Sequence, residues 1–137
     1  MNRADLQQLA DERVADASSL LRTGQWSGAY YVVGYAVECA LKSCIAKLVN
    51  LHDFPDKELA NRSFTHEIEV LVRVAGLAPA RDTDARLNPL LGQNWLIVKR
   101  WNERARYGRW TESEARELFL AVTDPVSGVL PWIKSRW

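Results

Sequence analysis

One short segment of this 137-residue chain, residues 99–109, concentrates side chains that bind phosphate. Five basic residues against one carboxylate, Glu103, leave a local charge of +4. The basic residues are Lys99, Arg100, Arg104, Arg106 and Arg109. Guanidinium groups bind phosphates through paired hydrogen bonds, and aromatic rings stack on bases. The segment therefore predicts a phosphate, nucleotide or RNA site, with binding candidates Arg100, Asn102, Arg104, Arg106 and Tyr107. The alternative is a solvated helix end, where basic side chains suit the helix dipole.

Across the whole chain, charge is balanced. Eighteen Lys and Arg residues against seventeen Asp and Glu residues leave a net charge of +1, so no global field attracts nucleic acid or a membrane. The apolar content of 47% excludes a disordered or fibrous protein. The longest apolar stretch, residues 29–41, is too short to cross a bilayer, and the first residues contain no apolar signal segment. We expect a soluble, cytoplasmic protein without a membrane partner.

A second unusual feature is Glu38, a lone carboxylate within an apolar helix predicted over residues 27–49. Helical geometry places Tyr31, Glu38 and Lys42 on one narrow polar stripe that could support the binding site. An unpaired buried carboxylate is costly, so Glu38 needs a partner or contact with water. Three hypotheses stay open: Lys42 is the partner, the stripe faces solvent, or Glu38 orients an arginine of segment 99–109 across a groove.

The remaining reactive side chains predict no catalytic set. His66 follows Thr65 at an expected helix start, and we interpret it as a surface residue rather than a general base. His52 lies in a predicted loop with no pattern around it. Cys39 and Cys44 lie within the apolar run and are expected in the core. Their spacing to the histidines fits no zinc motif, so we expect neither a metal nor a cofactor.

Helical periodicity and cap signals indicate an all-α chain. The expected helices span 3–22, 27–49, 66–75, 88–107 and a last helix after a capping box at 111–114, which Pro125 kinks or restarts before a final piece over 125–134. Residues 50–64 and 77–87 are expected as loops. Short connections force neighbouring helices to be antiparallel, which predicts an up-and-down four-helix bundle with one additional short helix, as a single domain over 1–137.

Three stretches of the sequence resemble the HEPN domain family, the higher eukaryotes and prokaryotes nucleotide-binding domain. Residues 27–42 (SGAYYVVGYAVECALK) resemble its second helix, residues 65–71 (THEIEVL) the segment after it, and residues 101–108 (WNERARYG) the segment before its last helix. The resemblance covers roughly residues 5–134. It implies an up-and-down helical bundle that forms homodimers. Many members are ribonucleases that use an Arg-x(4–6)-His motif, others bind nucleotides or RNA without catalysis, and some pair with a small nucleotidyltransferase.

The chain departs from that family's catalytic motif. Arg100 and Tyr107 lie in the register of an Arg-x4-His-x-Tyr motif, but Ala105 stands where the histidine would be. Alanine cannot transfer a proton, so we expect a non-catalytic homodimer that binds a nucleotide or RNA, with a nucleotidyltransferase partner in a toxin–antitoxin or defence context. One alternative is a metal-independent endoribonuclease with a degenerate motif. The other is a structural or partner-binding bundle.

Overall fold

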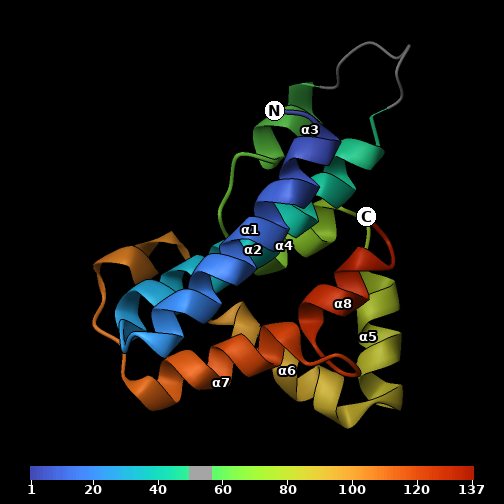
Figure 1. Cartoon of the computed structure of the whole chain (residues 1–137). Coiled ribbons are helices and arrows are strands. Elements are labelled where there is room, and N and C mark those ends of the chain that lie inside the picture. Colours follow the sequence, from blue (N-terminus) through green and yellow to red (C-terminus); the bar gives the residue numbers. More distant parts are fainter. Residues whose placement is uncertain (50–56) are drawn as a thin grey trace.

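The computed structural model describes residues 1–49 and 57–137, and every regular element in these ranges is helical (Figure 1). This confirms the predicted all-α class. The elements are α1 (Arg3–Arg22), α2 (Trp26–Lys47), α3 (Lys57–Arg62), α4 (Ile68–Val74), α5 (Ala78–Leu87), α6 (Pro89–Lys99), the 3₁₀ helix η1 (Glu103–Tyr107), α7 (Glu112–Thr123) and α8 (Val129–Lys134). None of the helices in these two ranges has the length and apolar character needed to cross a bilayer.

Helix α2 is the centre of the fold, as its apolar sequence predicts. Thirteen of its 22 residues are buried, and it contacts α1, α4, α7, α8 and η1. Helices α1 and α2 run alongside each other in Figure 1. Gly24, between them, has φ of +73°, a left-handed conformation that glycine adopts without a Cβ clash. The predicted span of the first helix, residues 3–22, is confirmed.

Several helix boundaries also follow the predicted cap chemistry. The Asn88 side chain caps α6 by accepting a hydrogen bond from a backbone N–H of its first turn. Thr111 and Glu114 form the predicted capping box of α7. The predicted interruption near Pro125 is confirmed, because α7 ends before it and the chain resumes a helix at Val129.

The prediction of a loop over residues 77–87 is wrong, because this segment forms α5. Its sequence lacks an apolar stripe, and none of its residues is buried. Polar contacts to other elements fix it instead. Arg81 donates two hydrogen bonds to Glu69, at 2.7 and 2.8 Å, and Asp84 accepts one at 2.8 Å from the indole of Trp132. Because these contacts are made with residues far away in the sequence, they produce no helical periodicity within residues 77–87 from which the helix could be predicted.

The predicted connection over residues 50–64 is also wrong in its last part, which contains α3. Residues 50–56, His52 included, lie outside the described residues. The helix expected to follow a Thr65 cap begins later, at Ile68. The Thr65 hydroxyl oxygen accepts a hydrogen bond from the backbone N–H two residues on, at 3.2 Å, so it holds the turn that leads into α4.

The predicted helix over residues 88–107 breaks after Lys99. The break lets the Trp101 indole turn inward, where the residue is only 1% exposed. Asn102 is extended, and its side-chain oxygen accepts a hydrogen bond at 2.8 Å from the backbone N–H of Arg104, which caps η1. Burial of the large Trp101 indole stabilises the fold more than continuation of one helix would, so α6 and η1 are separate elements.

Candidate functional site

The five basic side chains of segment 99–109 are all exposed, at the end of α6, along η1 and just beyond it. Within residues 1–49 and 57–137, none of them forms an ion pair with a carboxylate. Tyr107 is 76% exposed, and the guanidinium of Arg106 lies 4.8 Å from its ring centroid. The segment therefore presents open cations beside an accessible aromatic ring.

These side chains do not share one helix face. A continuous helix over residues 88–107 would place Arg100, Arg104 and Tyr107 on one face, but α6 ends before they are reached. The turn between α6 and η1 divides the segment instead. Arg104 lines a groove, whereas Arg100 and Tyr107 are not among the residues that line it.

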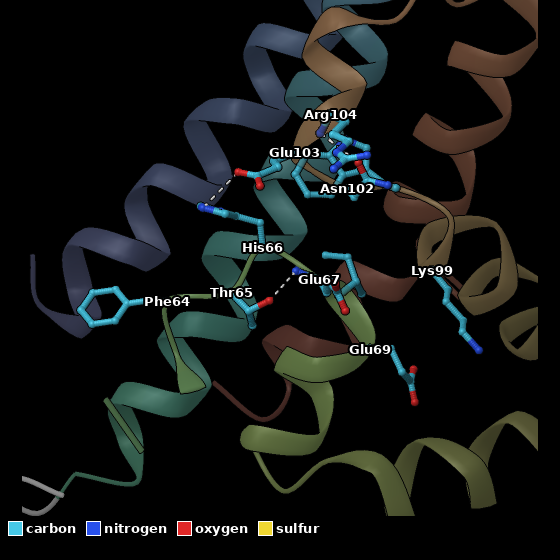
Figure 2. A pocket seen from close by; sticks show the side chains of 11 residues that line it. Phe64, Thr65, His66, Glu67, Glu69, Lys99, Asn102, Glu103 and Arg104 are labelled. Carbon is cyan, nitrogen blue, oxygen red and sulfur yellow. Dashed lines mark hydrogen bonds and ion pairs between the residues drawn. The ribbon is translucent and has the colours of Figure 1, made fainter. Parts of the chain in front are cut away.

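This groove, of about 720 Å³, lies between the chain entering α4 and the turn that joins α6 to η1 (Figure 2). Its volume is in the range of small-molecule sites. It is lined by Phe64, Thr65, His66, Glu67, Ile68, Glu69, Lys99, Trp101, Asn102, Glu103 and Arg104. The structure thus brings two of the predicted binding residues, Asn102 and Arg104, into the groove, although the oxygen of Asn102 is already used to cap η1.

Trp101 of the segment lies in the core and Trp110, just beyond the segment, packs against the core, so neither is a free stacking platform. Trp101 packs against Tyr31, with ring centroids 5.8 Å apart. Trp110 stacks on Tyr30 at 3.8 Å, and its indole N–H donates a 3.0 Å hydrogen bond to the carbonyl of Ala105. Ala105 is itself buried. Of the aromatic rings in the segment, only Tyr107 remains available to a base.

Glu38, on the polar stripe of α2, is buried, with its side chain 3% exposed. One carboxylate oxygen lies 3.4 Å from Nζ of Lys42, so the predicted pairing with Lys42 is confirmed. The other lies 2.9 Å from Nδ1 of His66. The hypothesis that the stripe faces solvent is wrong, because α4 and η1 contact α2. Among the described residues, no arginine of segment 99–109 pairs with Glu38.

His66 is the functional candidate that sequence reasoning missed. Its second ring nitrogen, Nε2, lies 3.3 Å from a carboxylate oxygen of Glu103, so the imidazole bridges the core and η1 (Figure 2). The side chain is 42% exposed on the groove. The one available signal was the need of Glu38 for a partner. His66 and Glu38 are 28 residues apart in the sequence, and no sequence pattern links them.

Burial makes the thiols of the two cysteines unreactive. Cys39 and Cys44 are buried, as predicted, and neither forms a disulfide. Burial raises the pKa of each thiol to about 11, so both are protonated at neutral pH and are poor nucleophiles. At the edge of the groove, hydrogen bonds from Arg81 hold the pKa of Glu69 below its usual value.

No group of three or more histidine, cysteine or acidic side chains in the described part of the chain is placed to hold a metal ion. Comparison of the chain with protein-family models, with curated proteins and with solved structures gives no match. The chemistry of the groove and of segment 99–109 is therefore the basis for assigning a function.

Proposed function

We propose that this chain binds a phosphorylated ligand, a nucleotide or RNA, through segment 99–109 and does not cleave it. The observation that carries the proposal is the set of five exposed basic side chains without an ion-pair partner among the described residues. Unpaired guanidinium groups retain their capacity for phosphate, and the exposed ring of Tyr107 is suited to stack on a base. Ala105 supplies no group that could transfer a proton.

The resemblance to HEPN domains extends this proposal to the whole chain. In that arrangement α1, α2, α6 and α7 are the long helices of an up-and-down bundle with additional short helices. The chain would act as a homodimer, with a small nucleotidyltransferase as its partner. A purely structural bundle is the competing hypothesis, and it explains the basic side chains by their place at the ends of α6 and η1, where they suit the helix dipole.

Removal of single arginines is expected to weaken binding to a short, fluorescein-labelled single-stranded RNA and to AMP. Arg100→Ala and Arg104→Ala should each cost about 1–3 kcal/mol of binding free energy, because each removes a charge-assisted contact. For RNA, each should also flatten the dependence of log K on log salt by about 0.7 per lost phosphate contact. Fluorescence anisotropy for RNA and calorimetry for AMP measure both effects and show which ligand is preferred.

Arg86→Ala is the matched control, because it removes an equal charge from an exposed position on α5. Tyr107→Phe should bind nearly as well as the unchanged chain, and Tyr107→Ala less well, since stacking needs the ring rather than the hydroxyl. RNA cleavage that disappears in Arg100→Ala would establish the ribonuclease alternative. Absence of both binding and cleavage would leave the structural role.

The homodimer is a separate expectation. Thirteen of the 22 residues of helix α2 are buried within the chain, so little of its apolar surface is left for an interface. The candidates are exposed leucines on outer helices, Leu90 and Leu96 of α6 and Leu120 of α7, which are 50 to 63% exposed. Light scattering at micromolar concentration should give twice the chain mass of 15.6 kDa, and Leu96→Glu should lower it. A monomer mass for the unchanged chain would contradict the expectation.

A further inference from the structure

We propose that Nε2 of His66 is a phosphate-binding point inside the groove, and that the Glu103 carboxylate competes with the ligand for it. This inference rests on the proposed function, since it extends the binding site from segment 99–109 to a residue of another segment. It names phosphate as the recognised group, whether the phosphate comes from RNA or from a free nucleotide.

The first step is the fixed orientation of the imidazole. Glu38, only 3% exposed, holds Nδ1 of His66 at 2.9 Å, and Lys42 lies 3.4 Å from the other carboxylate oxygen. A buried carboxylate on the central helix is a rigid anchor, so the ring cannot turn without giving up that hydrogen bond. The opposite ring nitrogen is thereby directed towards η1 and Glu103 (Figure 2).

The second step is the charge of the ring. Carboxylate oxygens only accept hydrogen bonds, so the imidazole engages Glu38 through Nδ1 and Glu103 through Nε2 at once only when each ring nitrogen carries a proton. Such a ring offers an N–H donor and a positive charge at Nε2. Phosphate oxygens are strong acceptors for this kind of donor.

The third step is the weakness of the Glu103 contact. Its carboxylate lies 3.3 Å from Nε2, is 51% exposed and makes no other hydrogen bond or ion pair with the described residues. Exposed ion pairs contribute little, so a ligand phosphate could displace it. Lys99 and Arg104 line the same groove without ion-pair partners in the described ranges, so both add positive charge that attracts a phosphate to it.

The test measures affinity for the labelled single-stranded RNA and for AMP with single and double variants. His66→Gln should weaken binding roughly tenfold, because a charged donor is lost. Glu103→Gln should tighten binding about twofold to fivefold, as removal of an exposed competitor allows. In the His66→Gln background, Glu103→Gln should bring almost no gain, because the competition acts at Nε2.

Glu67→Gln is the control, because Glu67 lines the same groove and its side chain forms no hydrogen bond or ion pair with the described residues. If Glu67→Gln and Glu103→Gln tighten binding equally, and still do so in the His66→Gln background, the gain in affinity comes only from the loss of negative charge. That result would overturn the inference. Unchanged affinity in both His66→Gln and Glu103→Gln would do the same. If Arg100→Ala still weakens binding in that case, the proposed function stands and only the inference fails. Glu103 is exposed, so its variant does not depend on the folding of the core.

Discussion

Replacement of Gly34 by alanine is expected to destabilise the fold by about 3 kcal/mol, the upper end of typical overpacking costs. A Cβ atom at this position would lie 2.2 Å from two atoms of the Trp101 indole, far inside van der Waals contact. Trp101 is 1% exposed and packs against Tyr31, so its ring can shift only by displacing packed neighbours. The intrinsic helical preference of alanine over glycine returns only about 1 kcal/mol. Urea unfolding followed by circular dichroism gives the difference.

Gly28→Ala provides the matched control within the same helix. A Cβ atom there would lie 3.4 Å from a methyl group of Leu20, an ordinary contact, so this variant should be neutral or slightly more stable. Trp101→Leu should relieve the clash, so the double variant with Gly34→Ala should lose less than the two single changes together. Equal stability of Gly34→Ala and Gly28→Ala would show that the indole yields easily.

Glu38→Gln is expected to lower the free energy of unfolding by about 2 kcal/mol, as the loss of a buried charged hydrogen-bond partner does. The cost stays below that of a fully buried pair, because His66 and Lys42 are 42% and 22% exposed and water can reach them. Glu12→Gln, on the exposed face of α1, should change stability by only a few tenths of a kcal/mol. A Glu38 variant equal to this control would disprove the partly buried network.

The sequence was most informative where local chemistry decides the structure. Asn88, Thr111 and Gly24 begin or end helices for reasons contained in a few neighbouring residues, and the helix boundaries predicted at these points are confirmed. The continuous apolar pattern of α2 likewise identified the central helix. Short-range hydrogen bonds and periodic burial are both visible in a linear sequence.

The errors at α5, at the break after α6 and at His66 arise where a distant contact outweighs the local pattern. Helix α5 depends on Glu69 and Trp132, which belong to other elements. The break after α6 depends on the fit of Trp101 against Gly34, two residues far apart in the chain. His66 gains its place through Glu38 in the same way. A single sequence carries no direct record of such pairs, so the side of the groove formed by residues 64–69 was not predicted.

The contact between Gly34 and Trp101 has an evolutionary consequence. Since the ring fills the space that a side chain at position 34 would need, the two positions should vary together among relatives of this chain. A relative with a larger residue at position 34 should carry a smaller one at position 101. The turn after α6 would then pack differently, and the basic segment that follows it would have a different backbone course. Covariation of this pair would therefore distinguish sequences that share this groove from those that share only the helices.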